Sequence, residues 1–421
     1  MIRKNIGKIS TIIKENKYIL FHNVFDRLFF FVFFVLIAKN YDVELYGKLI
    51  TFFTIGAITA ITFDMGLSTH LQKEIARKNE NKNNLFNTAF KLNAFLFLPY
   101  VLAAFIIYTV FINDMIIIYS LVIIINFFIS QINICNKALS GYKSFKNQFI
   151  ASFYPKIIFL ILYLILIYKF KPDLLLLMLC LAVFLLFNLI SALFFCYRAG
   201  FSLILSNGKS ENYMTFLKLS FPLGIALIIN LLYDKIDILL VSRLAGFTET
   251  GFYNAAYSIF KASTLGFTFI LNKGFNEFAE IKNDNILFKR YIIKYAKIIF
   301  GICIFINLIL FFIPDIFILF FYSSKFTDSS IILKILSFAF IGLGLNNLLG
   351  TALNGRGEYK AVMYITLVSL ILNVILNLIF IPLSGIKAAA TITVITEWMI
   401  FAGELIYVLR ILKINQKLAH I

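Results

Sequence analysis

Ionisable residues inside long apolar stretches are the part of this sequence that could do chemistry. Three cations, Arg27, Lys235 and Lys261, lie in the middle of apolar runs. Charged side chains in such surroundings are costly, so each one is a functional hypothesis by default. Arginine and lysine offer charge-assisted donors that suit phosphate groups. The three cations therefore favour a polar cavity that holds an anionic group of a substrate.

Acidic residues occur in the same kind of surroundings, at Asp26, Asp64, Asp234, Asp237 and Glu397. Asp234 and Asp237 are three residues apart, which places them on one face of a helix. These acids could pair with the cations or carry a coupling ion, H⁺ or Na⁺. The alternative is that the charged residues form interhelical ion pairs and hydrogen bonds that only hold the helices together.

Other residues suggest no further chemistry. Six lysines near the ends of apolar runs are expected to snorkel to the interface, namely Lys91, Lys156, Lys218, Lys294, Lys297 and Lys334. The four cysteines form no CxxC pair, and the three histidines are scattered. The sequence therefore predicts no metal centre and no cofactor apart from a coupling ion.

Pro222 and Gly224 lie near the start of one apolar run. A proline there either begins the helix or bends it. Because proline and glycine interruptions mark moving helices in transporters, a hinge at Pro222 and Gly224 is the second interpretation.

The elements that must position these residues are the apolar segments themselves. Of the 421 residues, 61% are hydrophobic and 14% are charged, and the mean hydropathy is +0.90. Soluble domains are about 25% charged. A soluble fold could not cover so much Phe, Ile and Leu. The composition therefore predicts an all-α polytopic membrane protein with about twelve transmembrane helices, because about 20 apolar residues cross a bilayer.

The predicted spans lie near residues 17–38, 46–69, 86–111, 114–136, 149–168, 174–197, 216–241, 251–272, 290–313, 329–352, 361–381 and 386–409. Basic residues orient these spans, since cytoplasmic loops carry more Lys and Arg than outer loops. They gather in the N-terminal segment and in alternate loops near 70–85, 137–148, 198–215, 273–290 and 354–360. This pattern predicts both termini in the cytoplasm. It also accounts for the net charge of +18, so nucleic acid is not an expected partner.

An internal repeat divides the chain. Residues 138–146 (ALSGYKSFK) resemble 352–360 (ALNGRGEYK), and 25–28 (FDRL) resemble 233–236 (YDKI). Both pairs lie about half the chain apart, and each half holds an even number of spans. We therefore predict two six-helix bundles, 1–205 and 206–421, related as a parallel repeat about an axis along the membrane normal. Two such bundles imply a central cavity and alternating access.

Four segments carry a resemblance to a known family. They are LIAKNYDVELYGKL (Leu36–Leu49), FDMGLSTHLQKEIAR (Phe63–Arg77), the stretch that opens with FPLG (Phe221–Ala262) and the stretch with the core LNVILNLIFIPLSGIKAAA (Ala352–Trp398). Their order and spacing resemble the Wzx-like O-antigen and polysaccharide flippases of the multidrug/oligosaccharidyl-lipid/polysaccharide exporter (MOP) superfamily. The chain departs from the family pattern at Lys387, where the family often has glycine.

The resemblance implies a MATE-like, two-lobed fold that moves an undecaprenyl-diphosphate-linked oligosaccharide between the leaflets of a bacterial inner membrane, for O-antigen of lipopolysaccharide or a similar surface polysaccharide. Arg27, Lys235 and Lys261 would contact the diphosphate or an acidic sugar. The acids listed above would be coupling or gating residues. Polymerase and chain-length proteins of the same pathway would be partners, and no enzymatic activity is implied.

Three alternatives remain open. A membrane-embedded O-antigen polymerase or ligase needs a sizeable outer loop, which this chain lacks. A multidrug antiporter of the same superfamily would favour an acidic cavity, and Arg27, Lys235 and Lys261 argue against one. A flippase for the peptidoglycan precursor usually carries additional spans.

Overall fold

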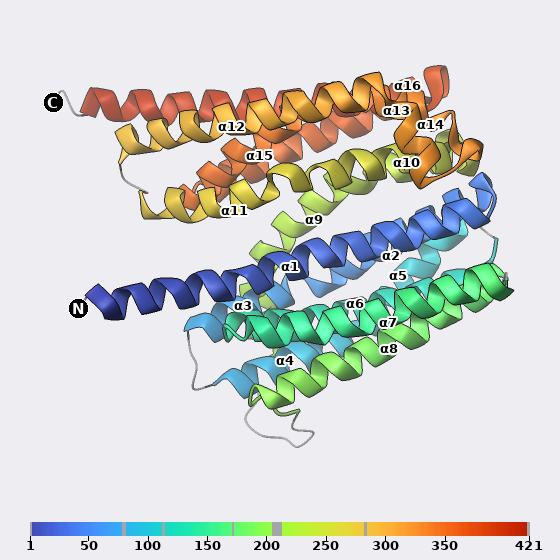
Figure 1. Cartoon of the computed structure of the whole chain (residues 1–421), viewed down its shortest axis with the longest axis horizontal. Coiled ribbons are helices and arrows are strands. Elements are labelled where there is room, and N and C mark those ends of the chain that lie inside the picture. The colour runs from blue at the N-terminus through green and yellow to red at the C-terminus, as the bar shows by residue number, and fades with distance from the viewer. Residues whose placement is uncertain are drawn as a thin grey trace. The chain divides into compact units, whose positions relative to one another are not determined.

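The structure, a computed structural model, describes residues 2–77, 81–111, 114–170, 172–203, 213–281 and 284–418. Side chains are described from residue 18 on, apart from those of residues 20, 111 and 414–418. Throughout this part of the chain the regular elements are helices and no β-strand occurs (Figure 1). The predicted all-α fold class is confirmed. The basic side chains at residues 3, 4, 8, 14 and 17, on which the cytoplasmic N-terminus is predicted, lie outside the described side chains.

The helices follow one another along the chain with short connections. They are α1 (Ile2–Asn40), α2 (Val43–Asp64), α3 (Leu67–Arg77), α4 (Lys82–Phe95), α5 (Phe97–Phe111), α6 (Ile116–Gly141), α7 (Phe145–Phe170), α8 (Leu174–Arg198), α9 (Tyr213–Leu244), α10 (Phe247–Ser263), α11 (Leu265–Glu280), α12 (Asn285–Phe312), α13 (Pro314–Phe321), the 3-10 helix η1 (Ser324–Phe326), α14 (Ser329–Ser337), α15 (Ala339–Arg356) and α16 (Tyr359–Leu418).

Within the described residues, nine helices are long and apolar enough to cross a membrane, or ten if α14 and α15, bent by 48°, form one broken span. The 60 residues of α16 would extend about 90 Å, three times the bilayer core. Gly385, with φ 61° and ψ −148°, kinks this element between the spans predicted at 361–381 and 386–409. The span predicted at 251–272 is divided between α10 and α11, which are 17 and 16 residues long.

The chain forms two compact units. Unit 1 comprises residues 1–33 and 52–228, and unit 2 comprises residues 34–51 and 229–421. α1, α2 and α9 each contribute to both units. The division of the sequence at residues 205 and 206 stays a prediction, as does the cavity between the bundles.

Unit 1 packs α6 against α3 and α8, and α7 against α8. The segment near 70–85, predicted as a loop, is helical over most of α3. Leu67, Leu71 and Ile75 are buried at a spacing of four residues, which is the apolar stripe of a helix that lies against the bundle. Residues 78–80 and 204–212, in predicted cytoplasmic loops, lie outside the described residues.

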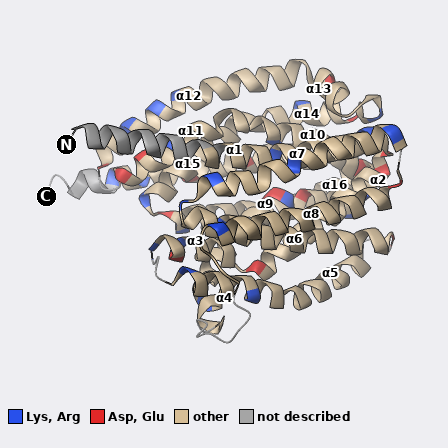
Figure 2. Cartoon of the chain, turned by 60° about the horizontal axis from the view of Figure 1, so that its bottom comes forward, with Lys and Arg blue, Asp and Glu red and all other residues tan. Residues whose placement is uncertain are grey.

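Unit 2 packs α15 against α11, α12 and α16, and α10 against α14. The N-terminal end of α2 joins this unit, where buried Tyr46 accepts a hydrogen bond from Asn254 Nδ2 at 2.8 Å. Most of the helical ribbon is neither acidic nor basic (Figure 2). The few charged side chains within the helices are therefore the natural candidates for a site.

Candidate functional site

Two lysines surround one carboxylate on α9 and α10 of unit 2. Lys261 Nζ lies 2.7 Å from Asp234 Oδ1, and Lys235 Nζ lies 3.6 Å from Asp234 Oδ2. The hydroxyl of Tyr257 also donates to Asp234 Oδ1, at 3.1 Å. We call Asp234, Lys235 and Lys261 the lysine triad. Two of the three predicted substrate-binding cations are thus brought together on one acid.

The lysine triad is partly accessible and carries a surplus of positive charge. Its three side chains remain 30–33% exposed. Two ammonium groups and one carboxylate leave one net positive charge. A charged group that is only partly screened by its partner can exchange that partner for another anion, and phosphate oxygens accept such charge-assisted hydrogen bonds well. The triad can therefore bind an anionic group.

A second carboxylate on α9 is surrounded by neutral donors. Asp237 Oδ2 accepts from the hydroxyls of Tyr253 (3.1 Å) and Thr393 (2.9 Å), and Asp237 Oδ1 accepts from Asn377 Nδ2 (2.9 Å). Asn377 Nδ2 also donates to Asn373 Oδ1 at 3.0 Å. Asp237 is 4% exposed and forms no salt bridge within the described residues.

The oxygen atoms around Asp237 suit a small cation. The Asp237 carboxylate, the Thr393 hydroxyl and the side-chain amides of Asn373 and Asn377 come together from α9 and both parts of α16. Asn377 Oδ1 is buried without a hydrogen-bond partner in the described structure. A buried carboxylate needs a positive partner or a proton. No cluster of three or more His, Cys, Asp or Glu side chains that could bind a transition metal occurs among the described residues.

Two further acids lie on the second part of α16. Glu397 is buried and accepts a hydrogen bond from Asn346 Nδ2 of α15. About two turns later, Glu404 is also buried, and its Oε2 has no partner in the described part of the chain. Glu404 is a buried acid that the sequence analysis did not single out, although it lies inside the predicted span 386–409.

The mid-helix acid of unit 1 has a different environment. Lys156 Nζ of α7 binds Asp26 Oδ1 at 2.6 Å, and His22 Nε2 lies 3.6 Å from Asp26 Oδ2. Lys156 is 5% exposed. The prediction that Lys156 snorkels is therefore wrong, because its ammonium has a carboxylate partner on the neighbouring helix. Arg27, next to Asp26, is exposed and makes no ion pair with any described side chain.

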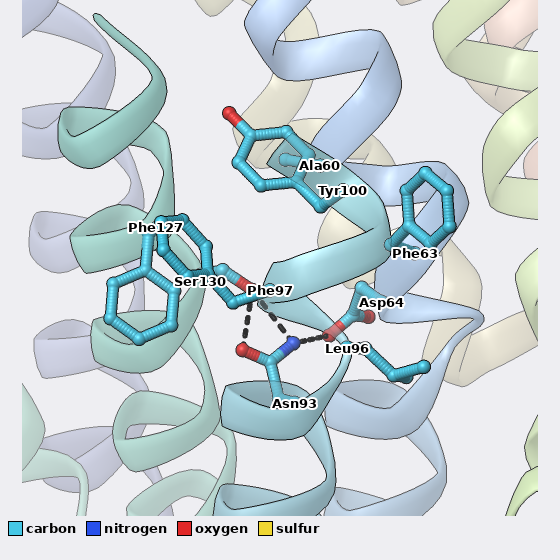
Figure 3. A pocket seen from close by; sticks show the side chains of 9 residues that line it. All are labelled: Ala60, Phe63, Asp64, Asn93, Leu96, Phe97, Tyr100, Phe127 and Ser130. Carbon is cyan, nitrogen blue, oxygen red and sulfur yellow. Dashed lines mark hydrogen bonds between the residues drawn. The ribbon is translucent and has the colours of Figure 1, made fainter. Parts of the chain in front are cut away.

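Asp64 ends α2 and is buried in unit 1. Asn93 Nδ2 donates to its Oδ1 at 3.2 Å, and Ser68 donates to its Oδ2 at 3.3 Å. The carboxylate borders a small cavity, which Figure 3 shows from close by.

Pro222 lies inside α9, nine residues after its first residue Tyr213, so the interpretation as a helix start is wrong. The backbone of Gly224 contacts the backbone of Met65 and Gly66, which connect α2 to α3. A Cβ on Gly224 would lie 2.5 Å from the carbonyl carbon of Met65, and a Cβ on Gly66 would lie 2.6 Å from the nitrogen of Gly224. Gly224 is thus required for this contact, and the hinge at Pro222 and Gly224 stays a prediction.

The neutral partners of Asp237 were missed by the sequence analysis. A signal was present, since Asn373 and Asn377 are four residues apart in an apolar run and therefore share a helix face. That Asn377 and Thr393, on opposite sides of the kink at Gly385, both bind Asp237 depends on tertiary packing that the spacing does not reveal.

Comparison with known proteins gives matches to two families. Residues 12–274, more than half of the chain, match the family described as polysaccharide biosynthesis protein. Residues 222–379 match the MatE family. An uncharacterized membrane protein of Methanocaldococcus jannaschii is 28% identical over 208 residues. That match covers 47% of this chain and 46% of the relative, so it spans about half of the relative's length.

Solved structures share the fold over most of the chain. An inward-facing multidrug resistance MATE family transporter of the MOP superfamily has a TM-score of 0.75 at 15% identity, over 93% of this chain and 95% of that one. The lipid II flippase MurJ, in an inward closed conformation, has a TM-score of 0.72 at 18% identity, over 93% and 87%. A MOP superfamily transporter from Pyrococcus furiosus has a TM-score of 0.66 at 14% identity, over 94% of each chain. These likenesses confirm the predicted MATE-like fold.

Proposed function

The chain belongs to the polysaccharide biosynthesis protein family, and we propose from this premise that it is a flippase for a lipid-linked oligosaccharide. Its substrate is an oligosaccharide repeat unit, of O-antigen or a similar surface polysaccharide, on an undecaprenyl diphosphate carrier. The protein moves this substrate from the cytoplasmic to the outer leaflet of a bacterial inner membrane by alternating access. Both termini lie in the cytoplasm, and polymerase and chain-length proteins of the same pathway receive the product.

The lysine triad is the single observation that carries this proposal. The negative charge of a diphosphate is costly in the apolar core of the membrane. Lys235 and Lys261 supply two ammonium groups that can bind the diphosphate and offset this charge. In the substrate-free protein Asp234 holds both ammonium groups, at 3.6 and 2.7 Å. On binding, phosphate oxygens replace the carboxylate. Release restores the ion pairs with Asp234, which keeps the bound state from becoming too stable for turnover.

Arg27 supplies a further cation in unit 1, where it is exposed and makes no ion pair with a described side chain. We assign it to attraction of the diphosphate or an acidic sugar. Its guanidinium is suited to bidentate contacts with phosphate. Asp26 is assigned to positioning Lys156 in the same unit, since the two groups form an ion pair of 2.6 Å.

A coupling ion, Na⁺ or H⁺, binds at Asp237 in this proposal. The carboxylate is hydrogen-bonded to neutral donors and forms no ion pair among the described residues, and Asn377 Oδ1 is a buried oxygen without a partner there. Asp237 and Asp234 are one turn apart on α9, so an ion at Asp237 acts on the helix that carries the lysine triad. Glu397 is assigned to gating on α16.

Transport in proteoliposomes tests the proposal. The probe is an undecaprenyl-diphosphate-linked disaccharide whose outer-leaflet fraction is read by added lectin. The wild type should raise this fraction, and Lys235→Met combined with Lys261→Met should remove the increase. Lys273→Gln, at a 73% exposed lysine of α11, is the matched control and should transport normally. Equal transport by the double variant and the wild type would overturn the assignment to the triad.

In cells, deletion of the gene separates a flippase from a polymerase. Single repeat units should accumulate on the cytoplasmic face if the protein is a flippase. Accumulation of flipped but unpolymerised units would identify a polymerase instead.

A second candidate function is export of organic cations, favoured by the match of residues 222–379 to the MatE family and by the buried acids Asp237 and Glu397. Ethidium efflux from proteoliposomes discriminates the two. An exporter of organic cations should move ethidium and should lose this activity in Asp237→Asn. A flippase should leave ethidium inside and move only the lipid-linked disaccharide.

A further inference from the structure

A small cavity lies in unit 1, whereas the lysine triad and Asp237 belong to unit 2. It has a volume of about 20 Å³, is partly open to the surface of the unit, and is lined by residues of α2, α4, α5 and α6 and by Leu96 between α4 and α5. A space of roughly 10–15 Å³ on this scale already holds one water molecule. The space therefore accommodates one small ion or a water molecule.

Oxygen atoms from three helices meet at this cavity (Figure 3). Asp64 lies on α2, Asn93 on α4 and Ser130 on α6. Asn93 Nδ2 donates to Asp64 Oδ1 at 3.2 Å and to Ser130 Oγ at 3.0 Å, and the Ser130 hydroxyl lies 3.2 Å from Asn93 Oδ1. A carboxylate, an amide oxygen and a hydroxyl thus surround one space, and such oxygens are the preferred ligands of hard cations.

The negative charge at this cavity forms no ion pair among the described residues, although Lys137 of α6 lies close enough to act on it electrostatically. Asp64 is 7% exposed and forms no salt bridge there. Lys137 on α6 donates instead to Gln72 Oε1, at 3.2 Å. Within the described part of the chain, Asp64 accepts hydrogen bonds only from neutral groups, namely the side chains of Asn93 and Ser68 and the backbone amides of Gly66 and Ser68. These hydrogen bonds leave its charge in place. The site therefore favours a bound positive charge.

Aromatic rings complete the wall. Phe97 and Phe127 lie with ring centroids 4.3 Å apart, and Tyr100 lies 5.7 Å from Phe97 and 6.5 Å from Phe63. The face of an aromatic ring carries partial negative charge and attracts a cation within about 6 Å. A single carboxylate with neutral oxygens and aromatic faces suits a monovalent cation. Divalent calcium usually takes several carboxylate ligands and six to eight oxygens.

We propose that the cavity bordered by Asp64, Asn93 and Ser130 binds one sodium-sized monovalent cation. This is a binding site in unit 1, separate from the coupling-ion site proposed at Asp237 in unit 2.

The position of this cation site gives it a structural consequence. Asp64 is followed directly by Met65 and Gly66, whose φ angles of 45° and 76° turn the chain from α2 into α3. This turn is the one that touches the backbone of Gly224 on α9. A cation on Asp64 therefore stabilises the turn against which α9 packs within unit 1.

Thermal unfolding of the full-length protein in nanodiscs tests the site. NaCl replaces choline chloride at constant ionic strength, in an Asp237→Asn background that removes the coupling-ion site of unit 2. Sodium should raise the unfolding midpoint by about 2–4 °C. Asp64→Asn should abolish this rise. Ser130→Ala should require about tenfold more sodium for the same rise, because one oxygen ligand is lost. Ser120→Ala, on the same helix with an exposed hydroxyl bonded to Ile116 O, is the matched control and should respond normally.

Three outcomes would overturn the proposal. The first is an equal midpoint in sodium and choline for the Asp237→Asn protein. The second is a midpoint that rises on acidification with no sodium effect, which would identify a proton site. The third is an unchanged sodium response in Ser130→Ala, which decides the matter even if Asp64→Asn does not fold. The measurement needs no glycan, so its failure would leave the proposed flippase activity standing.

Discussion

The two units place similar sequences, FDRL at 25–28 and YDKI at 233–236, in different electrostatic environments. In unit 1, Asp26 binds Lys156 at 2.6 Å, and that lysine is 5% exposed. In unit 2, Asp234 binds Lys261 at 2.7 Å, and that lysine is 30% exposed. The two ion pairs have nearly the same length. Lys156 and Lys261 differ in their exposure, which indicates that burial and partners determine what a charged residue within a span does. We therefore assign the pair of Asp26 and Lys156 to stability and the pair of Asp234 and Lys261 to substrate binding.

Removal of the buried lysine should have the largest effect on stability. Lys156→Met leaves Asp26 with only His22 beside it and should lower the free energy of unfolding by about 1–3 kcal/mol, because the carboxylate, itself 34% exposed, loses its hydrogen-bonded cation. Thermal unfolding in detergent measures the change. Asp26→Asn combined with Lys156→Met should recover most of the loss, since both charges are then absent. A double variant as unstable as the single one would show that the ion pair is not the cause.

Removal of the accessible lysine should affect transport and spare stability. Lys261→Met should change the free energy of unfolding by about 1 kcal/mol or less, since the pair is partly solvated. It should lower transport of the lipid-linked disaccharide by about 10- to 100-fold, the value of one hydrogen bond to a charged group. Transport and stability are measured on the same preparation. A variant that is unstable like Lys156→Met would erase the difference between the two units.

Removal of the acid of the lysine triad should strengthen the binding of substrate, whereas removal of a lysine should weaken it. Asp234→Asn removes the carboxylate that competes with phosphate, so the affinity for undecaprenyl diphosphate should rise by about three- to tenfold. Transport should nevertheless fall, because release no longer regains the ion pairs. Binding is measured by microscale thermophoresis in nanodiscs, with Asp26→Asn for comparison. Weaker binding by Asp234→Asn would mean that the carboxylate supports the substrate site rather than competing with it.

The smallest effect is expected at the exposed cation of unit 1. Arg27→Gln should change the free energy of unfolding by about 0.5 kcal/mol or less, as for most surface substitutions. Transport should fall by about threefold through the loss of one solvated contact with the substrate. Arg27→Lys should restore part of the rate. Normal transport by Arg27→Gln would remove Arg27 from the substrate path.

The fold class could be predicted because the thickness of the bilayer fixes the length of apolar segments, whatever their order. Details that depend on local backbone geometry could not. α10 and α11 divide a predicted span at Thr264, where no proline interrupts the sequence. The apolar stripe of α3 lies in a segment predicted as a loop, because Lys73, Glu74 and Arg77 interrupt the apolar sequence there.

The sequence allowed the charged residues of the candidate site to be predicted, but not the partners with which they interact. Asp234, Lys235 and Lys261 were identified because charge is costly in an apolar segment. The partners Lys156 for Asp26 and Asn377 for Asp237 lie more than 100 residues away in the chain, at sequence separations of 130 and 140. Such contacts arise from helix packing, which one sequence does not encode as a visible pattern.

Binding of undecaprenyl diphosphate to the purified protein in nanodiscs tests the central claim most directly. Lys261→Met should bind undecaprenyl diphosphate at least about tenfold more weakly than the wild type. Lys273→Gln should bind with wild-type affinity. Equal affinity of the wild type and Lys261→Met for undecaprenyl diphosphate would contradict the claim that the lysine triad is the diphosphate site.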